Sequence, residues 1–409
     1  MINQLGTGRV DNISLDMALG PAAFDGDRST PAWQGNGLTA SFDVIDGSVR
    51  ALNTLPVARD LTGSGKIENE NFSITGTNGH FRMQDGNIVK LPEIQFGVKR
   101  IAGPGIQPAE VSVRVEGSTD DLAVLADSEP INALDSFNLV PADLSGTGEV
   151  RVEASFPLTG QVSVKDVVWR ANLDLKDFTS TAKISGQSIE DADLIIQADN
   201  EQTLVSGKGK LNGFQSVIDF SASRDGSGAD DRQDVTFVAN AKDLKEYGID
   251  LQDYVTGSVK VGYEDVGGAK TFELDLSNAI INVPEVGWRK ASGVRAIARF
   301  RLTESGSSKT LHNFSFVAEG VEVRGNVKIN GVGDLVLADF SSFNLRPNDK
   351  AKMTVRPRSG GGFTVVMNAE RFDGRALFDS FGSDHAKASP KKQSVIAWGY
   401  FKYWSSDRF

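Results

Sequence analysis

The chain has 409 residues, no cysteine, and 54 acidic against 43 basic residues, which gives a formal net charge of −11. The lack of cysteine excludes disulfides, a thiolate nucleophile and a cysteine-ligated metal site, and acidic residues spread along the whole chain argue against a nucleic-acid-binding surface. The 43 glycines beside only 13 prolines are typical of many short strands and tight turns, so we expect an all-β protein.

Alternating apolar and polar residues mark the first 60 residues as strands. Leu15, Met17 and Leu19 fall on one parity, and residues 38–44 alternate in the same way. A period of two places successive side chains on opposite faces of a strand, so this pattern predicts strands with one apolar face.

A glycine-rich segment recurs along the chain. It reads DLTGSGKI from Asp60, DLSGTGEV from Asp143 and, more loosely, YVTGSVKV from Tyr254. Each copy follows a break and opens a new alternating run, which predicts structural sub-units that start near residues 60, 143 and 254. The irregular spacing of the copies argues against a strict solenoid repeat.

The alternation of apolar and polar residues is clearest between residues 143 and 222. The alternating runs of this stretch each put apolar side chains on one parity and polar ones on the other, with turn-rich links as short as residues 199–201 between them. Links this short join antiparallel neighbours, because a parallel return needs a crossover of a dozen or more residues. We therefore expect one long antiparallel meander with a continuous apolar face, and the runs lie at residues 148–156, 167–175, 192–198, 205–211 and 214–222.

Two short segments are expected to be helical, at residues 120–127 and 241–247. Both precede a copy of the recurring segment, so we expect lids or spacers along one edge of the sheet. Alternation resumes at Phe272 and is lost in residues 384–409, which concentrate Trp and Tyr. This tail is expected not to belong to the fold, and the alternative for it is an anchor at a membrane surface.

Residues that carry chemistry are scattered. The three histidines, His80, His312 and His385, show no spacing typical of paired metal ligands. Residues 63–66 (GSGK) resemble a phosphate-binding loop, but isoleucine follows where that loop needs Ser or Thr, and the helix that should follow is a strand. Residues 225–231 are acidic and glycine-rich, yet they lack the ligand spacing and the closing Glu of a calcium loop. We expect no enzyme, no metal site and no cofactor.

Membrane and export signals are also missing from the sequence as written. No window approaches the roughly 20 apolar residues that a membrane-spanning helix needs. The first ten residues have no apolar core of signal-peptide length. The expectation is a chain that carries neither a transmembrane segment nor export information of its own.

Three segments together resemble a known family. They are residues 278–290 (NAIINVPEVGWRK) with the Arg- and Ala-containing strand that follows to Leu302, residues 321–327 (VEVRGNV) and residues 55–60 (LPVARD). In these segments the chain resembles the central and C-terminal region of the AsmA-like proteins of the YhdP type. The resemblance covers roughly residues 10 to 380, and its motifs are structural rather than catalytic.

The resemblance implies both a fold and a role. It implies a long antiparallel sheet rolled into a groove that is open along one side, in a protein anchored in the inner membrane of Gram-negative bacteria. The implied role is to carry phospholipid through the periplasm between the inner and outer membranes. The chain lacks the family's N-terminal anchor helix, so we expect residues 1–383 to be an interior length of the groove, with the anchor supplied elsewhere and residues 384–409 as a non-matching tail.

The apolar parity of the strands supplies the candidate lipid-contact residues. If the sheet curls but stays open, this face keeps acyl chains dry while head groups remain in water. If the sheet closes, the same residues pack an ordinary core, and a closed structural or adhesive β-protein without lipid cargo is the alternative function. The expected partners are phospholipid acyl chains, not nucleic acid, and the oligomeric state stays open. The candidates are Val150, Val152, Phe156, Trp169, Leu173, Leu194, Ile196, Phe214, Phe220, Phe300, Phe314 and Phe316.

Overall fold

The computed structural model describes residues 6–19, 37–50, 54–68, 70–101, 105–129, 131–134, 139–159, 162–184, 186–224, 231–240, 242–243, 254–284, 287–331 and 334–374. These residues contain 22 strands, one α-helix and two short 3-10 helices, and every strand pairing is antiparallel, so the predicted all-β antiparallel fold is confirmed. The chain divides into two compact units. Unit 1 takes the described residues up to Gly213 with Ser223 and Arg224, and unit 2 takes Phe214–Ala222 and the described residues that follow Arg224.

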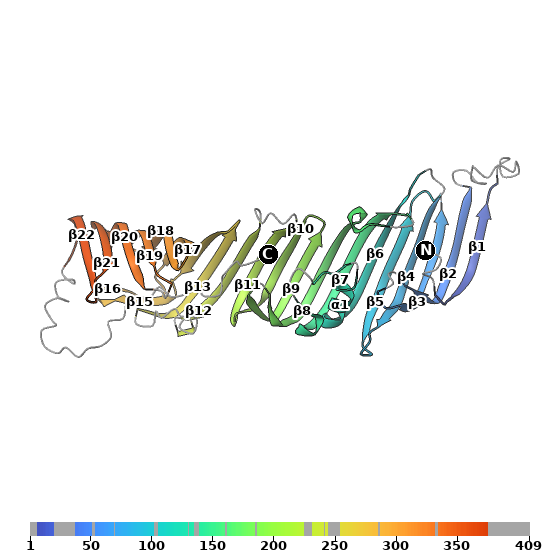
Figure 1. Cartoon of the computed structure of the whole chain (residues 1–409), viewed down its shortest axis with the longest axis horizontal. Coiled ribbons are helices and arrows are strands. Elements are labelled where there is room, and N and C mark those ends of the chain that lie inside the picture. Colours follow the sequence, from blue (N-terminus) through green and yellow to red (C-terminus); the bar gives the residue numbers. More distant parts are fainter. Residues whose placement is uncertain are drawn as a thin grey trace. The chain divides into compact units, whose positions relative to one another are not determined.

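Unit 1 is a meander in which each strand pairs with the next one along the chain, as Figure 1 shows. Where the links are short, consecutive strands joined by a tight turn become antiparallel neighbours. Longer stretches, residues 18–37 and 119–143, separate β1 from β2 and β6 from β7. The 3-10 helices Pro141–Asp143 and Val164–Asp166 precede β7 and β8. The strands are β1 (Arg9–Met17), β2 (Leu38–Val49), β3 (Ala58–Glu68), β4 (Asn71–Arg82), β5 (Ile88–Val98), β6 (Pro108–Ser118), β7 (Leu144–Pro157), β8 (Val168–Ile184), β9 (Gln187–Asp199) and β10 (Gln202–Leu211).

Bulges interrupt the strict alternation within single strands. In β8 the register with β9 shifts between Leu175 and Phe178, and Asp177 there has a positive φ of 51°. Aspartate is one of the few residues besides glycine that adopt this left-handed conformation readily. Because the bulge adds one residue to the strand, the buried parity changes from Leu175 on one side of it to Phe178 and Ser180 on the other.

The α-helix α1 (Thr119–Ala126) confirms the helix expected at residues 120–127. It follows β6 and packs its apolar side onto the sheet, where Leu122 and Leu125 form a buried cluster with Met83 and Val89. The buried carboxylate of Asp121 accepts hydrogen bonds from the Ser118 hydroxyl and from the Asn87 side-chain amide, at 2.7 and 3.1 Å. The helix therefore covers one end of the apolar face.

Unit 2 is a second antiparallel arrangement, with one branch. The first part of β13 pairs with β15, whereas its later part pairs with β14, and β14 continues to β17. The hairpin of β15 and β16 leaves the sheet at this branch. The strands are β11 (Phe214–Ser223), β12 (Arg232–Asn240), β13 (Val255–Val266), β14 (Ala269–Asp275), β15 (Ala279–Val283), β16 (Trp288–Lys290), β17 (Ala296–Ser305), β18 (Ser308–Ala318), β19 (Val321–Ile329), β20 (Leu335–Asn344), β21 (Lys350–Pro357) and β22 (Phe363–Arg371).

Aromatic side chains fill the core of unit 2. Phe272 is buried between Tyr263 and Phe300, with ring centroids 5.1 and 5.2 Å away. Trp288, from the β15–β16 hairpin, packs edge-on against Phe316 of β18 at 5.6 Å, so the hairpin lies against the apolar face of the sheet. Large aromatic rings contribute much of the apolar area that such a core removes from water.

The expected helix at residues 241–247, the loop at 225–231 and the tail at 384–409 lie wholly or almost wholly outside the described residues. The strands that carry the recurring segments begin at Ala58, Leu144 and Val255. Among the helices that the structure describes, none has the length and apolarity needed to cross a membrane.

Candidate functional site: the inner face of unit 1

The strand register of unit 1 lines up apolar side chains across neighbouring strands. Ile74 of β4 lies opposite Phe96 of β5, which lies opposite Val111 of β6. The row continues to Ala154 of β7 and Trp169 of β8. Residues directly opposite one another have Cβ atoms about 5 Å apart, so this row is a continuous apolar strip across five strands.

Further rows run parallel to this strip and together make up what we call the inner face of unit 1. Along each strand the rows are two residues apart, because every second side chain points to the same side. The rows are Leu15, Ala40, Ile67, Phe72, Val98, Ala109 and Phe156; Ile94, Val113, Val152, Ala171 and Ala198; and Val115, Val150, Leu173, Ile196 and Val205.

Burial is uneven along the inner face. At the end covered by α1, Leu175 of β8 and Leu194 of β9 are buried. Towards the opposite end of the face, Val152 of β7 and Trp169 and Ala171 of β8 are only half-buried. An apolar side chain that keeps part of its surface in water forgoes part of its hydrophobic stabilisation, and this end of the face therefore leaves apolar surface in contact with water.

Glycines of the recurring segment make room for inner-face side chains. A Cβ atom at Gly65 would lie 2.0 Å from the ring of Phe42, and one at Gly148 would lie 2.8 Å from Leu175. At both positions any larger residue would push the neighbouring side chain away from the backbone, so glycine allows the observed close packing. Gly65 and Gly148 are equivalent positions of the first two copies, which gives this part of the repeat a packing role.

The candidates from the sequence divide between the two units. In unit 1, Leu194 is buried and the other candidates are half-buried on the inner face. In unit 2, Phe300 and Phe314 are 7% and 6% exposed, so they belong to the packed core. The half-buried candidates of unit 1 are Val150, Val152, Phe156, Trp169, Leu173 and Ile196, and those of unit 2 are Phe214, Phe220 and Phe316.

Several inner-face residues were not among the candidates from the sequence. Phe42, Ile74, Phe96 and Val111 belong to the rows or lie next to them, and all are half-buried. Their strands alternate as clearly as those after residue 143, so the period of two was a signal that could have identified them. The candidate set was narrower than the face because it was drawn from the later runs of the chain.

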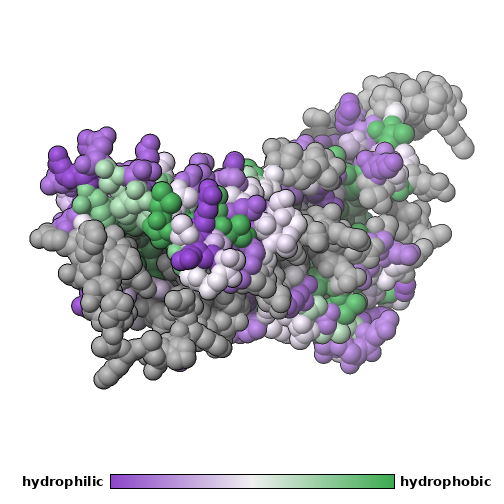
Figure 2. All heavy atoms as spheres, turned by 60° about the vertical axis from the view of Figure 1, so that its left-hand side comes forward, coloured by the Kyte–Doolittle hydropathy of each residue, from purple (hydrophilic) through white to green (hydrophobic). Residues whose placement is uncertain are grey.

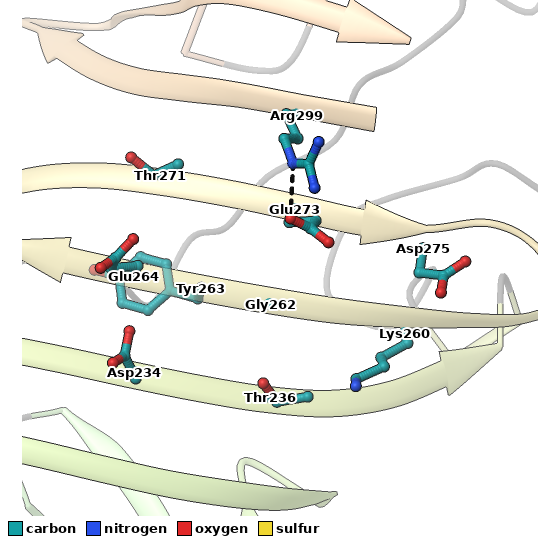
Figure 3. Close-up of a pocket in the computed structure, with 10 residues that line it drawn as sticks. All are labelled: Asp234, Thr236, Lys260, Gly262, Tyr263, Glu264, Thr271, Glu273, Asp275 and Arg299. Carbon is teal, nitrogen blue, oxygen red and sulfur yellow. Dashed lines mark hydrogen bonds and ion pairs between the residues drawn. The ribbon is translucent and has the colours of Figure 1, made fainter. Parts of the chain in front are cut away.

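The opposite, polar face of the sheets carries paired charges. In unit 1, Arg170 donates to Glu153 at 2.7 Å, and in unit 2, Arg299 donates to Glu273 at 2.7 Å. A hollow of about 620 Å³ lies beside the second pair, above Gly262, where the strand has no side chain (Figure 3). Exposed ion pairs such as these contribute little to stability, and they keep this face hydrated.

Titratable groups form no catalytic arrangement in the part of the chain that the structure describes. The ring of His80 lies 3.5 Å from Asp60, and that of His312 lies 2.8 Å from the Thr303 hydroxyl in a half-buried strand position. Burial, helped by the nearby Asp265 carboxylate, raises the pKa of Tyr263, whose hydroxyl lies 3.0 Å from that carboxylate. Within the described ranges, no group of three or more His, Cys, Asp or Glu residues is placed to hold a metal ion.

The strand β22 of unit 2 is an exposed apolar edge. Its pairing partner is β21, and Phe363, Val365 and Val366 are exposed. Figure 2, in which this end comes forward, shows hydrophobic side chains bordered by hydrophilic ones. Residues 358–362 join β21 to this strand.

Comparisons with known proteins return nothing similar. No protein-family model, no curated protein and no solved structure matches this chain. Function is therefore inferred from the residues of the chain and their arrangement in each unit.

Proposed function

We propose that this chain is a length of a lipid-carrying β-sheet. The half-buried inner face of unit 1 holds the acyl chains of phospholipids, and their head groups stay in water. The observation that carries this proposal is the set of parallel apolar rows, which cross up to seven strands. At the end away from α1, Val98 and Ala109 are buried, whereas Phe156, Trp169 and Ala171 of β7 and β8 stay half-buried.

The energetics suit transport more than tight binding. Each methylene group that leaves water contributes about 0.8 kcal/mol, so an acyl chain on this face gains stabilisation in small, equal steps. Apolar contact has no preferred direction, and neighbouring rows offer the same chemistry. A lipid therefore moves from row to row without breaking any one strong interaction.

The resemblance to the AsmA-like proteins of the YhdP type supports a cellular setting for this role. We infer a place in the periplasm of a Gram-negative bacterium, with phospholipid passing between the inner and outer membranes as part of outer-membrane lipid homeostasis. The partner implied is an inner-membrane anchor segment. The face itself supports only the acyl-chain contact, and the setting comes from the resemblance.

The second candidate is a structural or adhesive β-protein without lipid cargo. The observation that favours it is the aromatic core of unit 2, where side chains of the apolar face such as Phe272 and Phe300 are buried against one another. If a protein partner buried the inner face of unit 1 in the same way, no lipid could bind there. The two candidates therefore differ in what occupies the half-buried end of unit 1.

The test is native mass spectrometry with lipid extraction on the full chain, directed to the periplasm and purified from cells. The wild type is expected to carry phospholipid. Val152→Glu places a charge in the middle of the inner face and is expected to abolish the bound lipid. The matched control is Ile195→Glu, which places the same charge on the polar face of β9, where Ile195 is half-exposed, and is expected to keep the lipid.

Circular dichroism establishes that each variant is folded. A folded wild type that carries no lipid and takes up no fluorescent phospholipid would refute lipid transport for this chain. In that case the structural or adhesive role becomes the better explanation.

A further inference from the structure

The inner face of unit 1 ends at a rim of turns, and Trp169 lies beside one of them. Its backbone N–H donates to the side-chain oxygen of Asn200 at 2.8 Å. The amide nitrogen of the same Asn200 donates to the carbonyl of Val167 at 3.0 Å. These two bonds fix the start of β8, and with it the backbone that carries the indole ring, to the turn between β9 and β10.

A guanidinium group lies over this ring. Cζ of Arg224 is 5.3 Å from the centroid of the Trp169 ring, within the range of a cation–π interaction. The backbone N–H of Arg224 donates to the carbonyl of Glu201 at 2.7 Å, which ties the arginine to the same rim. Arg224 is exposed, whereas the ring below it is half-buried. A cation thus stands where the apolar face meets water.

The carboxylate of Asp199 lies at the turn between β9 and β10, on the same rim. One carboxylate oxygen of Asp199 accepts the backbone N–H groups of Glu201 and Gln202 at 2.8 and 2.9 Å. These bonds, and to a lesser extent the positive charge of Arg224, lower the pKa of Asp199. Among the described residues no carboxylate forms an ion pair with the Arg224 guanidinium, in contrast to Arg170, which pairs with Glu153 on the polar face.

We propose that Arg224, held over Trp169, binds the phosphate of a phospholipid whose acyl chains lie on the inner face of unit 1. This inference rests on the proposed lipid-carrying function and adds a head-group site to it. A guanidinium presents planar paired donors that match phosphate oxygens, and its contact with the indole ring limits the freedom it loses on binding.

The dimensions of the face fit this arrangement. From Trp169 to Leu175 the strand β8 runs six residues, which is about 20 Å at 3.3 Å per residue. The acyl chains of one bilayer leaflet span about 15 Å, half of a hydrocarbon core of about 30 Å. A lipid whose phosphate sits at Arg224 therefore has room for its chains along the strands before the end that α1 covers.

The test compares two lipids that differ only in the phosphate head group. Dioleoyl phosphatidylglycerol and dioleoylglycerol are offered together to the full chain from non-ionic detergent micelles, and the bound lipids are counted by native mass spectrometry. The wild type is expected to favour the phospholipid about tenfold, the size of one charge-assisted contact. Arg224→Gln is expected to bind the same total lipid with the preference lost, and Arg224→Lys to keep part of it.

The matched control is Arg170→Gln, which removes an exposed arginine from the polar face next to Trp169 and is expected to leave the preference unchanged. An unchanged preference in Arg224→Gln overturns the head-group site and leaves the lipid-carrying function standing. A wild type that binds neither lipid overturns the lipid-carrying function itself. Loss of the preference in Arg170→Gln as well also overturns the site, because it assigns the effect to general surface charge.

Discussion

The ammonium group of Lys290 connects the β15–β16 hairpin to the neighbouring loop through several backbone carbonyl groups. The side chain is 3% exposed. It donates to the carbonyl oxygens of Ala279 and Ala291 at 2.7 and 2.9 Å. It also lies 3.0 and 3.2 Å from those of Val294 and Ser277. One buried cation thus joins the start of the β15–β16 hairpin to the loop that leads into β17.

Removing this ammonium group is expected to destabilise unit 2. Lys290→Met keeps an apolar stem of similar length but leaves the carbonyls without their donor, at a cost on the order of 3 kcal/mol. Thermal unfolding followed by circular dichroism measures the change. Lys260→Met, at an exposed position on the polar face, is the control and is expected to shift the unfolding temperature by little.

The same variant gives a pH dependence with a defined sign. Burial lowers the pKa of Lys290 below its ordinary value of 10.5, and Asp275 opposes the shift. The unfolded chain then binds more protons than the folded one, so stability from this group rises as the pH approaches 10.5 from below. The stability difference between wild type and Lys290→Met is expected to widen over that range. A difference that narrows would contradict the assignment.

At the scale of elements, α1 decides which end of the inner face is covered. Leu122 is buried against Met83 and Val89, and Val150 of β7 packs against the same cluster. Leu122→Ala is expected to cost about 2–5 kcal/mol, because the cavity it leaves is only partly refilled. Hydrogen exchange of the β5 and β6 amides measures the loss. Val124→Ala, on the exposed side of the same helix, is expected to leave that exchange nearly unchanged.

Helix α1 and the bulge in β8 show which local features the alternation of apolar and polar residues does and does not predict. The helix was predictable, because a short polar start led into a non-alternating run. The bulge at Asp177 was not predictable, because a positive φ at an aspartate has no signature in the period of two. Its consequence, the change of buried parity between Leu175 and Phe178, became visible only through the pairing of β8 with β9.

At the scale of the whole molecule, the two units use the same apolar pattern differently. Unit 2 buries its central part in aromatic stacks, as at Phe272 and Phe300, and leaves Phe214, Phe220 and Phe316 half-buried, whereas the β7–β8 part of unit 1 is half-buried over several rows. A phospholipid with a diazirine in its acyl chain is therefore expected to crosslink to the β6–β8 region of unit 1 and not to the core strands β14 and β17 of unit 2. Mass spectrometry of the digested chain maps the labelled peptides. Equal labelling of both regions would contradict the assignment of the acyl site to unit 1.

Local sequence patterns were enough to establish the fold class, the strand polarity and the apolar parity of most strands. Period-two alternation sets which side of a strand is apolar, and links of two or three residues allow only antiparallel neighbours. The same patterns identified Val150, Val152 and Trp169 as side chains of that apolar side. Each of these properties depends on residues close together in the chain, which is why the sequence alone contains them.

What covers the apolar side depended on tertiary contacts. Alternation cannot separate the buried Phe300 from the half-buried Leu173, since the pattern says which way a side chain points and nothing about what lies over it. Burial depended on segments distant in sequence: α1 over the end of the inner face near Leu175, and Trp288 of the hairpin against Phe316. The placement of Arg224 over Trp169 likewise arises from the meander, which brings a residue from beyond β11 to the start of β8.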